Sequence, residues 1–150
     1  MPGNKLPDFV FRGTTINYPG NNNAVQLPYT CTSFHPVKAL WFALECLHLQ
    51  PDGAVVYVAK TRKLSDFNLI YNHFNRLENE IGFAMAPVDF YACCEGYIHV
   101  ANFQRVLATN GIEAYNVVRK DNLTRICRET PDLNAKKIVT LVEQMLPLLR

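Results

Sequence analysis

Three short stretches of this sequence hold residues whose types and spacing suit chemistry on a polar, negatively charged ligand. They are Arg12-Gly13, Thr32-Ser33 and Glu78-Asn79-Glu80. An arginine guanidinium makes planar, two-pronged contacts with phosphate. Small hydroxyl residues before a helix supply hydrogen-bonding groups beside free backbone N–H groups, and a carboxylate stabilises positive charge that develops during a reaction.

The first stretch ends a predicted strand over Phe9 to Arg12. Side chains alternate along a strand, so if Phe9 and Phe11 face the core, Val10 and Arg12 face the other way. Gly13 has no side chain and would let a ligand approach the backbone closely. The alternative is a solvated charge followed by a turn.

The second stretch joins a predicted strand, Tyr29 to Ser33, to a helix that begins at Pro36 and runs to about Leu49. Proline suits the first helical position because its missing N–H is not needed there. Ser33 lies at the junction, where it either binds a ligand or simply caps the helix.

The predicted helix is apolar over most of its circumference, which indicates burial. Trp41 and Phe42 are interpreted as core residues. Lys38, Glu45 and His48 form a narrow polar stripe.

The third stretch places Glu78 and Glu80 two residues apart, so on a strand both face the same side. Two carboxylates on one face can divide the work of stabilising charge and moving a proton.

An aromatic-Arg-Gly strand, a hydroxyl-rich strand leading into a helix, and a Glu-x-Glu strand, in this order, resemble the mono-ADP-ribosyltransferases of the arginine, serine, glutamate class. The resemblance covers roughly residues 9 to 91. It implies an ADP-ribosyltransferase-like α+β fold, with two packed, mostly antiparallel sheets around an NAD cleft and flanking helices.

The resemblance also implies roles for individual residues. Glu80 would be the catalytic carboxylate at the NAD ribose, and Glu78 would engage the acceptor and assist its attack. The expected NAD-binding residues are Arg12 for the phosphates, Gly13 for the nicotinamide amide, and Thr32 and Ser33 as braces that orient Glu80. Phe74 is a further candidate for contact with the target.

The second stretch departs from the family pattern at Cys31, which stands where the family usually carries the first serine of Ser-Thr-Ser. A thiol is a weaker hydrogen-bond donor than a hydroxyl, which bears on the orientation of Glu80. Reading Thr30-Cys31-Thr32 as the motif instead would shift the register by one residue and reverse the faces.

The predicted function is an NAD-dependent enzyme that transfers ADP-ribose to a protein side chain, and Glu78 favours arginine as the acceptor. Such small catalytic domains are typical of bacterial toxins and effectors. The alternatives are an NAD glycohydrolase, a transferase acting on a small molecule, and an inactive binding module of the same fold. A cysteine nucleophile at Cys31, paired with His35 or His73, is the rival chemistry.

Composition limits these classes without choosing among them. The chain has 150 residues, 49% of them hydrophobic, which predicts one domain over residues 1–150. A net charge of +2 does not suggest nucleic-acid binding. Five cysteines, an odd number, favour a reducing compartment, so we expect a cytoplasmic protein or one delivered into a target cell's cytosol.

Other familiar sites are not expected. The seven glycines form neither a dinucleotide-binding nor a phosphate-loop pattern, and Cys94 with His99 makes at most half of a zinc site. No apolar run approaches a membrane span. Oligomeric state is not indicated.

The remaining elements are predicted from periodicity. We expect a central strand over Ala54 to Ala59, a helix over Asn102 to Asn110 closed by Gly111, a strand over Ile112 to Val118, and an amphipathic helix after Pro131. Further strands are predicted around Ile81, Phe83, Val88, Phe90, Tyr97, Ile98 and Val100, with a bend at Pro87.

Overall fold

The computed structural model describes residues 7–15, 30–45, 53–64, 69–70, 79–112, 125, 128, 130 and 132–150. The strands are β1 (Phe9–Thr15), β2 (Thr30–Ser33), β3 (Ala54–Lys60), β4 (Leu69–Ile70), β5 (Glu80–Phe83) and β6 (Gly96–His99). The helices are α1 (Pro36–Glu45), α2 (Thr61–Leu64), α3 (Pro87–Cys93), α4 (Val100–Thr109) and α6 (Ala135–Met145), followed by the 3-10 turn η7 (Leu146–Leu148).

These strands form one sheet in the order β4-β5-β2-β1-β3-β6. Each neighbouring pair is antiparallel. The fold is therefore α+β with an antiparallel sheet, as the sequence predicts. The resemblance implies two packed sheets, but the described strands form one sheet, because β1 and β2 pair with each other.

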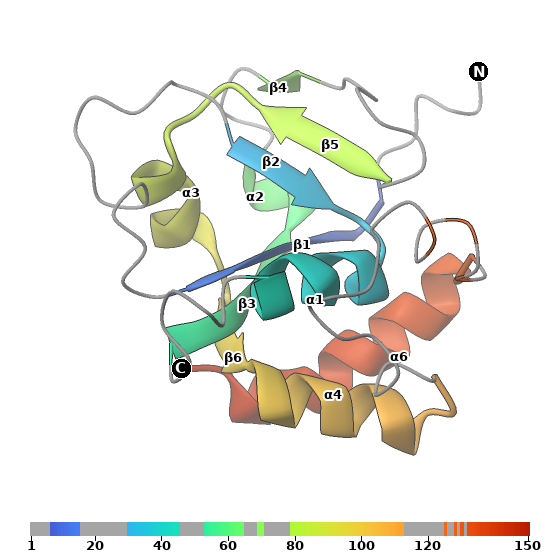
Figure 1. The fold of residues 1–150 in the computed structure, drawn as a ribbon. Helices are drawn as coiled ribbons and strands as arrows, with labels where there is room; N and C mark the ends of the chain where they lie inside the picture. The colour runs from blue at the N-terminus through green and yellow to red at the C-terminus, as the bar shows by residue number, and fades with distance from the viewer. Residues whose placement is uncertain are drawn as a thin grey trace.

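Strand β1 pairs with β2 over a much shorter length than with β3. Strand β1 pairs with β3 over its whole length, from Phe9–Lys60 to Thr15–Ala54. It pairs with β2 only at Phe11–Ser33. Figure 1 shows the two strands close together at one end and diverging toward the other. The sheet thus consists of two halves, β4-β5-β2 and β1-β3-β6. They are joined by the single residue pair Phe11–Ser33.

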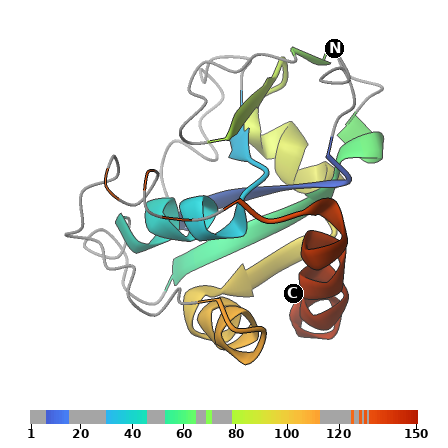
Figure 2. The ribbon, with the colours of Figure 1, turned by 90° about the vertical axis from the view of Figure 1, so that its right-hand side faces the viewer.

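Helices cover both faces of the sheet. We call these the α1 face, to which Phe11 points, and the α3 face, to which Val10 points. Phe11 packs in a core with residues of α1, α4 and α6, whereas Val10 packs with residues of β5, α2 and α3. Figures 1 and 2 show α4 and α6 on the side of the sheet away from α3. The predicted alternation of Phe11 and Val10 is confirmed, and both are fully buried.

Helix α1 begins at Pro36, as predicted. The His35 ring caps it, because Nδ1 accepts a hydrogen bond of 3.2 Å from the Val37 N–H. The helix then lies directly on β1. A Cβ atom added at Gly13 would overlap the Ala39 carbonyl oxygen and lie 2.6 Å from the Ala43 nitrogen. Gly13 therefore permits the close approach of α1.

Two predictions about local structure are wrong. Val88 and Phe90 lie in helix α3 rather than on a strand, because Pro87 starts a helix there instead of a bend. Val100 begins α4 rather than ending a strand. Lys38, in the polar stripe of α1, is only 3% exposed.

Several other predictions agree with the structure. Strand β3 lies inside the sheet, α4 ends just before Gly111, which has a φ of +76°, and α6 follows residue 131. Residues 113–118 of the predicted last strand lie outside the described residues, as do His48, His73, Phe74 and Glu78.

Candidate functional site

The candidate site lies where β1 and β2 diverge. Beyond Phe11, the described residues pair with β1 only from the β3 side. Among the described residues, β1 is therefore paired on both sides only at Phe11. The Arg12 side chain bridges the two diverging strands, since its Nη1 donates a hydrogen bond of 2.9 Å to the Cys31 carbonyl oxygen on β2.

Arg12 is half-buried and held by neutral acceptors. Its Nε donates to the Tyr91 hydroxyl at 2.9 Å, in addition to the bond to Cys31. Among the described residues no carboxylate forms an ion pair with Arg12, whereas Glu95 pairs with Lys60 and Lys63. A guanidinium has five N–H groups, and these two bonds leave three of them for another acceptor.

Tyr91 presents its hydroxyl to Arg12 from helix α3. Its ring stacks on the Tyr57 ring of β3, with centroids 4.1 Å apart, and meets the Phe90 ring edge-on at 5.7 Å. Burial raises the pKa of Tyr91, against the opposing effects of the Arg12 charge and of hydrogen bonds from Arg12 and Thr14. Tyr91 is therefore a neutral phenol at pH 7, and packing fixes the position of its oxygen.

The predicted hydroxyl residues bond to backbone. Thr32 Oγ1 donates to the Ile81 carbonyl oxygen at 2.9 Å, which ties β2 to the residue that follows Glu80. Ser33 Oγ accepts from the His35 N–H at 3.1 Å and lies 3.3 Å from the His35 carbonyl oxygen as a donor. Ser33 thus stabilises the turn that leads into α1, while the His35 ring caps the helix itself.

Glu80 is the first residue of β5, and it is half-buried. It lies directly opposite Ser33 in the register between β2 and β5. Because Ser33 is also the partner of Phe11, these three residues point to the α1 face. Glu78, the other predicted carboxylate, lies outside the described residues.

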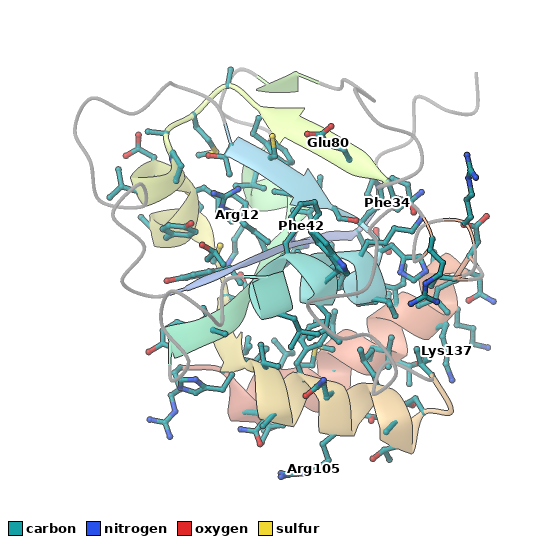
Figure 3. The ribbon with its side chains drawn as sticks, in the orientation of Figure 1. Arg12, Phe34, Phe42, Glu80, Arg105 and Lys137 are labelled. Carbon is teal, nitrogen blue, oxygen red and sulfur yellow. The ribbon has the colours of Figure 1, made fainter. Side chains whose placement is uncertain are left out.

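The structure brings some of the predicted residues together and separates others. Ser33 and Glu80 are cross-strand neighbours, whereas Thr32 pairs with Ile81 and points to the α3 face. Arg12 and Glu80 leave the sheet on opposite faces, because Arg12 shares the α3 face with Val10. Figure 3 shows Arg12 between β2 and α3, and Glu80 on β5, beyond β2.

Comparison of the chain with protein-family models, curated proteins and solved structures finds no match.

Two further properties concern the described residues alone. Among them, no group of three or more His, Cys, Asp and Glu side chains is placed to hold a metal ion. None of the helices they form is long and apolar enough to span a membrane.

A cavity of about 310 Å³ lies near the start of α1 and α6. Its lining includes the residue that follows Ser33 and the residue that precedes Glu80, but not Ser33 or Glu80 themselves. The lining residues are Phe34, His35, Asn79, Asp132, Leu133 and Ile138.

Sequence reasoning missed Tyr91, Asn79 and Lys38. Tyr91 contacts Arg12 from helix α3, which the sequence predicts as a strand, so the contact could not be expected from that prediction. Asn79 was treated as the spacer of Glu-x-Glu. Lys38 carried a usable signal, because one lysine in the middle of an apolar helix is either a solvated residue or a buried one with a partner.

Proposed function

We propose that this chain is an NAD-dependent mono-ADP-ribosyltransferase, a glycosyltransferase that moves ADP-ribose from NAD to a side chain of a target protein. The observation that carries the proposal is the half-buried Arg12 guanidinium, which bridges the diverging strands through neutral acceptors. A cation held in this way, with N–H groups to spare, suits the pyrophosphate of a dinucleotide. NAD would act as co-substrate.

The chemistry requires a carboxylate beside the ribose. When the bond between the ribose and nicotinamide breaks, its electron pair leaves with nicotinamide and positive charge develops on the sugar, much as in glycoside hydrolysis. In the proposal Glu80 stabilises this charge. The acceptor atom then bonds to the ribose carbon and gives up a proton.

The position of the site supports a ligand of dinucleotide size. Arg12 and Glu80 lie on opposite faces, with β2 between β1 and β5, so a small anion cannot contact both at once. In the proposal, an extended dinucleotide runs from phosphates at Arg12 to a ribose near Glu80. The two-sheet cleft of the resembled family would correspond to the place where β1 and β2 diverge.

The acceptor in this proposal is a protein arginine, on the strength of Glu78 in the Glu-x-Glu motif. Action in the cytosol of a target cell, as a toxin or effector, fits the cysteine content. With water as acceptor, the same site would be an NAD glycohydrolase.

A binding module without catalysis is the second candidate. Two observations favour it: Arg12 and Glu80 project from opposite faces, and Cys31 stands where the family carries a serine. In that case Arg12 would still bind a phosphate ligand, and Glu80 would have no catalytic effect.

The deciding experiment measures nicotinamide release from NAD by the purified chain, alone and with cell lysate. Glu80→Gln is compared with Glu143→Gln, which alters an exposed carboxylate on α6. We expect release to fall about 100-fold to 1000-fold in Glu80→Gln and to be unchanged in Glu143→Gln. Labelling of a lysate protein would identify the transferase. NAD binding without release would establish the binding module, and absence of both would overturn the proposal.

A further inference from the structure

Lys38 is buried in the middle of helix α1, with 3% of its surface exposed. A lysine is almost never buried this fully unless a partner satisfies its ammonium group, because removing the charge from water is costly. The groups around Lys38 Nζ therefore show what the side chain holds in place.

One of these groups is the Asn79 side chain. Lys38 Nζ donates to Asn79 Oδ1, which connects α1 to the residue just before β5. The Asn79 carbonyl oxygen accepts a second hydrogen bond, 3.1 Å long, from the Phe34 N–H. Asn79 is thus held by α1 through its side chain and by the chain that follows β2 through its backbone.

The backbone of Asn79 explains why it is held. Its φ of 53° is the one positive value among the described residues other than glycine. Asparagine tolerates this left-handed conformation better than most residues. The turn at Asn79 directs the chain into β5, whose first residue is Glu80. The conformation of Asn79 therefore sets the starting position of Glu80.

We infer that Lys38 is a positioning residue for Glu80 and acts through its hydrogen bond to Asn79. The inference rests on the proposed function for its catalytic consequence. Its structural consequence, a fixed start of β5, does not depend on NAD chemistry.

Kinetics of nicotinamide release test the catalytic consequence. Lys38→Met keeps the length and apolar stem of the side chain but removes the donor. We expect kcat to fall about 10-fold to 100-fold, since small displacements of a catalytic group are costly, and KM for NAD to change less than about twofold, because Arg12 is untouched. Asn79→Gly should have the same effect, while Asn79→Asp, which keeps an oxygen acceptor, should retain most of the activity.

A double-mutant cycle separates positioning from general stability. If Lys38 acts through Asn79, the variant that combines Lys38→Met with Asn79→Gly should be no slower than either single variant. Losses that simply multiply, or equal effects on kcat and KM, would overturn the inference. Lys136→Met, which changes an exposed lysine of α6, is the control.

Amide hydrogen exchange provides a readout without activity. In Lys38→Met, or in Asn79→Gly if the first variant does not fold, exchange should accelerate in a peptide covering residues 79–83 and remain unchanged in β1 and β3. Unchanged exchange in residues 79–83 would overturn the inference even in an active enzyme. Faster exchange there, in a chain that releases no nicotinamide, would support Lys38 as a brace of β5 and count only against the proposed function.

Discussion

Arg12 is held by two groups that come from different parts of the fold. Its Nε meets Tyr91 on α3, and its Nη1 meets the Cys31 carbonyl on β2. A planar guanidinium can reach both at once because its donors point in fixed, different directions, whereas a lysine ammonium is a single point charge. Arg12 therefore depends on the shape of its side chain as well as on its charge.

We expect Arg12→Lys to weaken binding of NAD, and of ADP-ribose as a non-reacting probe, by about tenfold, which corresponds to about 1.4 kcal/mol. Titration calorimetry measures the affinity, and thermal unfolding checks that the variant is folded. Arg105→Lys changes an arginine on α4 that bonds to Asn102 and should bind like the wild type. Equal affinity in all three proteins would exclude a phosphate contact at Arg12.

Tyr91→Phe tests the support of Arg12 separately. The substitution keeps the ring stacked on Tyr57 but removes the acceptor of Arg12 Nε, so it should destabilise the fold by about 1 kcal/mol and weaken ADP-ribose binding. The matched control is Tyr97→Phe on β6, whose ring also lies beside Tyr57. Binding that is lost equally in both variants would assign the effect to the aromatic cluster as a whole.

At the scale of elements, the contact between α1 and β1 determines how the site is framed. Gly13 lies under α1, so any larger residue must push the helix away from the strand. We expect Gly13→Ala to destabilise the fold by about 1–3 kcal/mol, the usual cost of overpacking. Urea unfolding measures this, with Gly111→Asn as the control.

The Gly111 control is informative because that glycine has open space around it and a φ of +76°, which asparagine tolerates. Gly111→Asn should therefore cost little. If Gly13→Ala folds with normal stability but loses NAD binding, the glycine contacts the ligand, as the family resemblance implies, and its packing against α1 is secondary.

Local signals predicted the elements that frame the site. The alternation of Val10 and Phe11 identified β1, and Pro36 marked the start of α1. The same approach failed at α3, because Val88 and Phe90 alternate as in a strand while Pro87 and Asp89 suit the first turn of a helix. Only packing of Phe90 into the core decides between the two, and packing is not local.

The motifs select candidate residues but not their geometry. Motif order selects Arg12, Ser33 and Glu80 as candidates, and the strand register places Ser33 opposite Glu80. Their separation from Arg12 depends on strand order and on the single pair between β1 and β2. Pairings between strands far apart in sequence leave no periodic trace in either strand.

For the molecule as a whole, the described groups with clearly shifted pKa values lie around β3, α3 and the start of β6; they are Tyr57, Tyr91, Cys94 and Glu95. A hydrogen bond from Lys63 lowers the pKa of Glu95, with further help from the charges of Lys63 and Lys60. A lowered carboxyl pKa contributes stability above the unfolded pKa, and that stability is lost as the pH falls through the folded value. Acid should therefore weaken the link between α2 and the start of β6.

Alkali should act on the same region through Tyr57. Burial, with smaller effects from Tyr91 and Cys94, raises its pKa from 10.0 to about 12. The folded state holds this proton more tightly than the unfolded state, so the stabilisation is complete below about pH 10 and is lost as the pH rises toward 12.

We expect the free energy of unfolding, measured with urea, to decline between pH 10 and 12 in the wild type. In Tyr57→Phe it should decline less, because position 57 then has no proton to lose. Parallel curves for wild type and variant would show that Tyr57 does not drive the decline.

Because Tyr57 stacks on Tyr91, ionisation of Tyr57 should also disturb the acceptor of Arg12. Binding of ADP-ribose should therefore weaken over the same pH range in the wild type and persist to higher pH in Tyr57→Phe.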